Sequence, residues 1–183
     1  ASPEDRALEI RWAVDDFRHH FSRDPEGIWL AECAVDTPTL ESLADQGLSF
    51  VILAPRQARA VLERGEPVPV GAAGPGIGVP YRVPLPSGRS LSVVFYHGPL
   101  SQAIAFEGLL HDGEQFWRRI AGEARGLEQR PVPLHGGSGP DTARDNGGAR
   151  LLTLATDGET YGHHFTFGEM ALAHGLAQGY AGR

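Results

Sequence analysis

The chain has 183 residues, of which 41% are hydrophobic, and a formal net charge of −7. This length and composition suit one sizeable folded core and argue against a disordered chain. The negative charge is not offset by any basic cluster, which argues against nucleic acid and against an anionic membrane surface as partners. No apolar run approaches the roughly 20 residues of a membrane-spanning helix and no signal-peptide pattern is present, so the cytoplasm is the expected location.

Two residue types narrow the possible chemistry. All 16 basic residues are arginine, so this stretch cannot supply a phosphate-loop lysine or a lysine that forms a Schiff base. Cys33 is the single cysteine, which excludes an internal disulfide and a cysteine-based zinc site and fits a reducing compartment. We interpret Cys33 as a small buried residue, with a catalytic nucleophile as the alternative.

The first third of the chain alternates helices and strands. Helical spacing of apolar residues, with proline at the start and glycine at the end, predicts helices, whereas apolar runs bounded by turn residues predict strands. In chain order the predicted elements are a helix over 3–22, a strand over 28–33, a helix over 37–47, a strand over 48–54 and a helix over 56–63. This order is typical of an α/β fold with a parallel sheet.

The rest of the chain mixes loops, a hairpin and helices. The predicted elements are a loop over 65–78, a hairpin of strands 81–85 and 91–96, a helix from Pro99, a helix capped by Asp112, a strand over 151–156 and a helix after Thr166. The glycine-rich stretch 131–149 is expected to be flexible. The buried face of the last helix is predicted to comprise Phe167, Met170, Ala171 and His174.

Two carboxylates lie at the ends of predicted strands. Alternation places Thr153, Ala155 and Asp157 on one face, so Asp157 is expected at the mouth of a crevice, and Glu32 lies near the end of strand 28–33. Parallel strands bring such ends together at one edge of the sheet. Glycosidases need a carboxylate pair of this kind. The alternative is that both acids cap neighbouring helices, and spacing alone does not decide between the two.

Two stretches resemble a known family. The sequence GIWLAECAVD at residues 27–36 is similar to the region around the nucleophile of glycoside hydrolase family 57, and TDGETYGHH at residues 156–164 is similar to its general acid/base region. The match is closest to a little-characterised branch known mainly as a domain of unknown function, and it extends through residues 90–110. The resemblance implies that Glu32 is the nucleophile and Asp157 the general acid/base.

The resemblance also implies a fold and a substrate. The family has an incomplete seven-stranded (β/α) barrel and acts on α-glucans with retention of configuration, by hydrolysis or transfer, without an obligatory metal or other cofactor. The expected partner is therefore a polysaccharide or oligosaccharide. Residues 1–183 would form a single, partial barrel region of parallel strands, with 65–97 as a loop and hairpin insertion. The two carboxyl groups would lie about 5 to 6 Å apart, as retaining enzymes require.

Further residues of the two stretches would line the substrate site. Glu159, His163 and His164 would bind sugar hydroxyls or orient Asp157. Trp29 would provide a surface on which a sugar ring stacks, although strand alternation places it opposite Glu32 and favours burial against the helix layer.

Two other functions stay open on the sequence. A metal-dependent carbohydrate deacetylase would use Asp157 with His163 and His164, but adjacent histidines in an extended chain point apart. A non-catalytic carbohydrate-binding relative would keep the acids without turnover. Of the other histidines, His19, His20 and His111 are interpreted as solvated helix-surface or loop residues, and His174 as a residue of the last helix's face.

The chain is expected to be part of a larger assembly. Its first residue is Ala1, the family's early histidine- and glutamate-containing motifs are absent, and only about four predicted strands are central. A barrel of this type usually needs about 250 residues. We therefore expect either the remainder of a longer polypeptide or further copies of the chain to complete the fold, and little activity from residues 1–183 alone.

Overall fold

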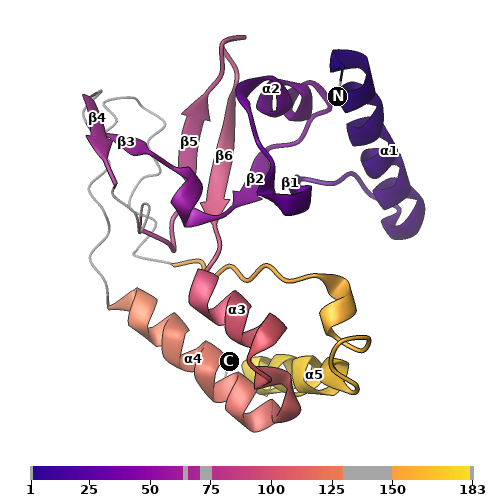
Figure 1. Cartoon of the computed structure of the whole chain (residues 1–183), viewed down its shortest axis with the longest axis vertical. Helices are drawn as coiled ribbons and strands as arrows, with labels where there is room; N and C mark the ends of the chain where they lie inside the picture. Colours follow the sequence, from indigo (N-terminus) through magenta and orange to yellow (C-terminus); the bar gives the residue numbers. More distant parts are fainter. Residues whose placement is uncertain (1, 64–65, 71–75, 130–149, 182–183) are drawn as a thin grey trace. The chain divides into compact units, whose positions relative to one another are not determined.

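The computed structural model describes residues 2–63, 66–70, 76–129 and 150–181. The chain divides into two compact units (Figure 1). The first unit comprises Ala1–Ala54 and Pro80–Phe95, and the second comprises Pro55–Val79 and Tyr96–Arg183. Both units mix helices with strands, which confirms the predicted α/β class.

A four-stranded sheet forms the centre of the first unit. Its order is β1 (Gly27–Trp29), β2 (Phe50–Leu53), β6 (Ser90–Phe95) and β5 (Tyr81–Pro84). The first three strands are parallel, and β5 is an antiparallel edge strand. The register places Val51 opposite Val93, and both side chains are buried. The parallel sheet and the β5–β6 hairpin thus confirm the sequence prediction, and β6 lies between β2 and β5.

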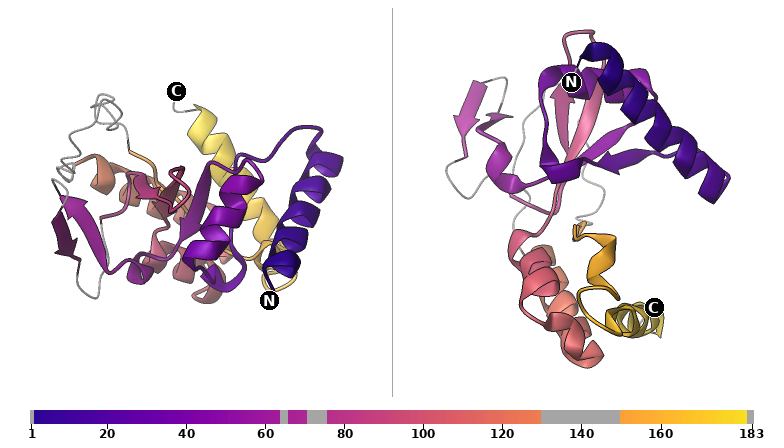
Figure 2. Two further views of the ribbon diagram at one scale, coloured as in Figure 1. Left: turned by 90° about the horizontal axis from the view of Figure 1, so that it is seen from above. Right: turned by 45° about the vertical axis from the view of Figure 1, so that its right-hand side comes forward.

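Two helices complete the first unit. The α1 helix (Pro3–Phe21) begins with a capping box between Ser2 and Asp5, and α2 (Thr37–Asp45) links β1 to its parallel neighbour β2. The two helices pack side by side (Figure 2). Gly47 follows α2 with φ +83°, the left-handed conformation predicted for a helix end. Apolar residues of the helices and of the sheet fill the core of this unit, among them Ile10, Val14, Leu40, Leu43 and, from β6, Leu91.

The second unit is built around helices. These are α3 (Gly98–Phe106), α4 (Gly113–Glu128) and α5 (Gly168–Ala181), with short 3₁₀ turns η3 (Leu109–His111) and η4 (Gly158–Thr160). Its core cluster contains Leu100, Ile104, Leu110, Phe116 and Ala171. The α4 and α5 helices pack closely, because a Cβ atom on Gly175 would lie 3.0 Å from the Phe116 ring. Asp112 caps α4 as predicted, accepting hydrogen bonds from two backbone N–H groups.

The predicted helix over 56–63 is wrong. A short 3₁₀ turn, η2 (Pro55–Gln57), is followed by the strand β3 (Ala60–Glu63). This strand pairs in antiparallel fashion with β4 (Glu66–Pro69). The pairing with β4 outweighs the favourable helix propensity of the local sequence, which contains mainly Ala, Arg, Gln, Leu and Glu. The β4 strand also replaces part of the loop predicted over 65–78.

The predicted strand over 151–156 is also wrong. This segment, drawn in orange in Figure 1, belongs to no sheet. Its backbone bonds instead to Gly78, to His97 and to the Ser101 hydroxyl. The apolar residues still have the predicted role, because Leu152 and Leu154 pack against the helical core.

The last helix differs from its predicted burial. Ala171 is buried, but Phe167 and Met170 are 71% and 63% exposed. The predicted flexible stretch 131–149 lies outside the described residues. The described residues contain six strands in two sheets, fewer than the seven of the expected barrel. Within the described ranges, no helix is long and apolar enough to cross a membrane.

Candidate functional site

Glu32 lies in a strained turn that follows β1. It is exposed, and its φ of +54° and the +53° of Cys33 put two successive non-glycine residues in the left-handed region. This conformation costs about 1 to 2 kcal/mol per residue. The turn is closed by the Cys33 N–H, which donates to the Leu30 carbonyl at 2.9 Å. Strained residues cluster at active sites, and two in succession make this turn a candidate site.

The position of Glu32 corrects the sequence prediction. The β1 strand ends at Trp29, so Glu32 lies three residues beyond it within the 3₁₀ turn η1 (Ala31–Cys33). Strand alternation therefore does not determine the face on which the Glu32 side chain lies. The backbone turns here because its hydrogen bonds are made locally, including one of 3.0 Å from the Ala34 N–H to the Ala31 carbonyl.

Trp29 stabilises the same turn through a hydrogen bond. Its indole N–H donates to the Cys33 sulfur at 3.3 Å, and Cys33 is buried, as predicted. Trp29 itself is 37% exposed, so the burial favoured by alternation is incomplete. The indole thus contributes to the position of the turn and still presents part of its surface to solvent.

Asp36, the next carboxylate, is engaged as a helix cap. It accepts a hydrogen bond of 2.8 Å from the Thr39 N–H and another from the Thr39 hydroxyl, and Arg6 lies 3.8 Å away. The hydrogen bond from the Thr39 hydroxyl, and to a smaller extent the one from the Thr39 N–H, lowers the pKa of Asp36. Asp36, although also exposed, therefore has a structural role at α2, and Glu32 remains the candidate functional carboxylate of this stretch.

Asp157 ends a segment that is anchored at alternate residues. We call residues 151–157 the Asp157 segment. The His97 N–H donates to the Thr153 carbonyl at 2.8 Å, and the Ala155 N–H donates to the Ser101 hydroxyl at 3.1 Å. Asp157 is exposed, and its own carbonyl accepts from the Thr160 N–H at 3.1 Å. The carboxylate thus extends from a backbone that is fixed on both sides.

Glu159, His163 and His164 lie in the turn that follows Asp157. The Glu159 carbonyl accepts hydrogen bonds of 3.0 Å from the N–H groups of both histidines, and His164 Nε2 lies 3.8 Å from Glu159 Oε1. The imidazole rings are 5.3 Å apart. The expectation that they point apart in an extended chain is wrong, because the backbone forms a tight turn here. All three residues are exposed.

Buried Thr160 and partly buried Tyr161 hold this turn on the helical core. Thr160 is 2% exposed, and Tyr161 packs against the core cluster while its hydroxyl accepts from Thr156 at 3.1 Å. Upstream of this turn, Thr153 Oγ1 is buried without a hydrogen-bond partner among the described residues. A buried polar atom of this kind lowers the stability of the fold. Such a local conflict is more common near functional sites than elsewhere.

His97 is a buried polar residue that the sequence patterns did not single out. It is 7% exposed and caps α3, with Nδ1 accepting from the Leu100 N–H at 3.1 Å. Its Nε2 lies 3.2 Å from Glu123 Oε2, and the other Glu123 oxygen lies 3.3 Å from Arg119. The local signal was a histidine followed by Gly-Pro directly after an apolar strand, which predicts a helix start but not these contacts.

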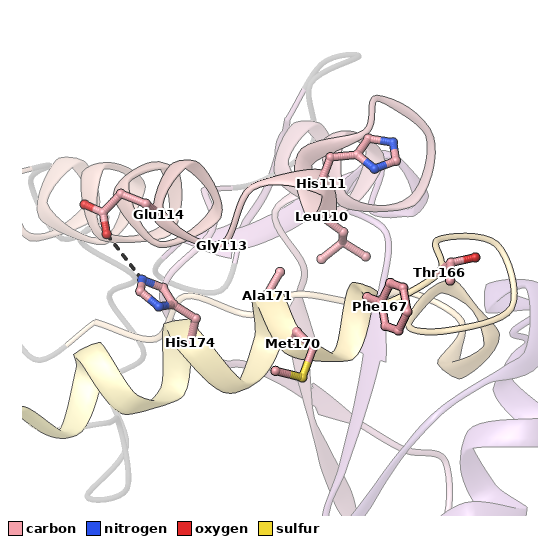
Figure 3. A pocket seen from close by; sticks show the side chains of 9 residues that line it. All are labelled: Leu110, His111, Gly113, Glu114, Thr166, Phe167, Met170, Ala171 and His174. Atoms are coloured by element: carbon pink, nitrogen blue, oxygen red, sulfur yellow. Dashed lines mark hydrogen bonds and ion pairs between the residues drawn. The ribbon is translucent and has the colours of Figure 1, made fainter.

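A separate pocket of about 470 Å³ lies between the starts of α4 and α5 (Figure 3). His174 and Glu114 pair across it at 3.2 Å, and exposed Phe167 and Met170 form part of its wall. It contains none of the predicted site residues. Among the described residues, no group of three or more His, Cys, Asp or Glu side chains is placed to hold a metal ion.

The predicted site residues fall into two groups. Trp29 and Glu32 belong to the first unit, whereas Asp157, Glu159, His163 and His164 belong to the second. A family model, glycosyl hydrolase family 57, matches residues 2–176 and so includes both groups. The chain belongs to this family. Family 57 membership confirms the resemblance seen in residues 27–36 and 156–164.

Two solved structures have a fold similar to that of this chain. The 4-α-glucanotransferase of Thermococcus litoralis superposes with a TM-score of 0.58 at 18% identity, over 95% of this chain and 21% of that protein. The α-amylase AmyC of Thermotoga maritima gives 0.52 at 14% identity, over 96% of this chain and 42% of that protein. The chain thus spans less than half the length of either protein. Comparison with curated protein sequences gave no match.

Proposed function

We propose that this chain is part of a retaining glycoside hydrolase or glucanotransferase that acts on α-glucans. The carrying observation is the family 57 match, which spans residues 2–176 and hence both Glu32 and Asp157. The geometry around each residue supports the proposal. Glu32 is an exposed carboxylate on a strained turn, and Asp157 is an exposed carboxylate on an anchored segment.

In the proposed mechanism the two carboxyl groups act in turn. The Glu32 carboxylate attacks the anomeric carbon while the Asp157 carboxyl gives its proton to the glycosidic oxygen, so the C–O bond breaks and a glycosyl ester forms on Glu32. Asp157, now a carboxylate, then takes the proton of an incoming water or sugar hydroxyl. That oxygen attacks the same carbon and releases Glu32. Water gives hydrolysis and a sugar gives transfer.

The neighbouring residues fit the binding of sugar hydroxyls. Glu159, His163 and His164 place hydrogen-bonding groups within seven residues of Asp157, all of them exposed. Trp29 presents part of an indole three residues before Glu32, a surface on which the apolar face of a sugar ring can stack. We assign these four residues to substrate binding.

The proposal extends to the fold of the complete protein. We infer that the three parallel strands β1, β2 and β6 belong to an incomplete seven-stranded barrel. The remaining strands would come from the rest of a longer polypeptide or from another copy of the chain. Because this chain spans less than half of each solved relative, the activity is proposed for the complete protein.

The proposal is tested by the products of the complete protein with maltooligosaccharides. Proton NMR should show the α-anomer as the first product, because two successive displacements retain the configuration. Longer oligosaccharides among the products would identify transfer, and shorter ones alone would identify hydrolysis. A first product with the β-anomer, or a folded protein without turnover of any α-glucan, would contradict the proposal.

A further inference from the structure

The start of α3 holds the Asp157 segment through two hydrogen bonds. One joins the His97 N–H to the Thr153 carbonyl at 2.8 Å, and the other joins the Ala155 N–H to Ser101 Oγ at 3.1 Å. His97, which caps α3, and Ser101 within it are almost fully buried, with exposed fractions of 7% and 5%. The bonds replace the sheet ladder that the segment lacks and fix its register.

The His97 end of this contact is itself held rigidly. The Leu100 N–H donates to Nδ1, so the neutral ring carries its proton on Nε2 and donates it to the Glu123 carboxylate at 3.2 Å. Arg119, one turn earlier on α4, lies 3.3 Å from the second Glu123 oxygen. The imidazole therefore links α4, the first turn of α3 and, through its own backbone, the Asp157 segment.

The spacing of the two hydrogen bonds bears on the face to which Asp157 points. They engage residues 153 and 155, and Asp157 is the next alternate position. Its backbone is extended, with φ −61° and ψ 142°, and its carbonyl is held by the Thr160 N–H on the far side. A slip of one residue in such a segment would turn Asp157 to the opposite face.

We propose that Ser101 and His97 are positioning residues for Asp157, which they hold in place through the backbone of residues 153–155. The inference rests on the proposed role of Asp157 as general acid/base. Displacement of a catalytic group by about 1 Å costs about 100-fold in rate. The bond from the Ser101 hydroxyl is the one that a side-chain substitution can remove.

The test uses Ser101→Ala in the complete protein with aryl α-glucosides whose leaving groups differ in acidity. A displaced acid matters most when the leaving group needs a proton. We expect kcat/KM to fall by about 10- to 100-fold for poor leaving groups and by less than about threefold for good ones. Ser101→Thr keeps the hydroxyl and should retain most of the parent rate. Gln102→Ala, an exposed change on the same helix, is the matched control.

A second readout is independent of turnover. Amide hydrogen exchange at Ala155 should be faster in Ser101→Ala than in the parent and unchanged in Gln102→Ala, with both variants folded by circular dichroism. An active parent whose Ser101→Ala variant loses rate equally for all leaving groups, or loses none, would overturn this inference alone. A parent without activity on any of these substrates would overturn the proposed function and the inference with it.

Discussion

Glu32→Gln is expected to abolish turnover of α-glucans, with kcat reduced by about 10⁴-fold or more. The amide keeps the shape of the side chain but is too weak a nucleophile to form the glycosyl ester. The exposed position of Glu32 means that the substitution leaves no buried group unpaired, so the fold should be unaffected. Steady-state rates with maltooligosaccharides measure the loss, and the melting temperature provides the control for folding.

The strained backbone of Glu32 allows a sharper version of this experiment. Glu32→Gly should stabilise the protein by about 0.5 to 1 kcal/mol, because glycine adopts φ +54° without a steric penalty, and it should also abolish turnover. Ser22→Gly is the matched control, since Ser22 is exposed in the first unit and has φ +53°. It should give a similar stabilisation and keep full activity. A Glu32→Gly protein that is stabilised and still active would show that the turn has no catalytic role.

Asp157→Asn is expected to impair a different step. The variant cannot protonate the glycosidic oxygen, so natural α-glucans should be cleaved about 10² to 10⁴-fold more slowly. Substrates with good leaving groups should form the glycosyl ester at nearly the parent rate, because they leave without a proton. The second step, which needs Asp157 as base, then becomes limiting and should appear as a burst of released aglycone.

The contrast between Glu32 and Asp157 is the informative comparison. Glu32→Gln should be inactive with every leaving group, whereas Asp157→Asn should recover with good ones. Equal residual activity of both variants across the series would show that the two roles are misassigned.

Local signals explain which parts of the fold were predictable. The α1 helix starts at Ser2-Pro3, Asp112 caps α4, and the apolar run around β2 forms a buried strand, because each of these features depends on residues close in sequence. The Leu152 and Leu154 packing was predictable in the same way. The signal there was apolar periodicity, which reports burial even where the element type is wrong.

The errors share a physical cause. The 60–63 segment became a strand because it pairs with residues 66–69, and the 151–156 segment is not a strand because its partners are Gly78, His97 and Ser101. Such partners lie outside the segment itself, so the propensity of its own residues does not report them. The two left-handed residues after β1 likewise have no sequence signal, because neither is glycine.

The sequence proposes which residues form the candidate site but not their geometry. Its residues came from the resemblance of two short stretches to family 57, and the family match over residues 2–176 confirms that resemblance. The contacts that hold these residues in place were not predicted. Burial of His97 and Ser101 and their bonds to the Asp157 segment depend on how α3 packs, which the motif residues themselves do not encode.

The central claim is that Glu32 forms a covalent bond with the sugar, and trapping of that intermediate tests it most directly. The complete protein carrying Asp157→Asn is treated with 5-fluoro-α-glucosyl fluoride, whose good leaving group allows the first step while its ring fluorine slows the second. Digestion and mass spectrometry should then show one fluoroglucosyl group, attached to Glu32. A fluoroglucosyl group on any other residue, or turnover of the reagent without a trapped ester, would contradict the account.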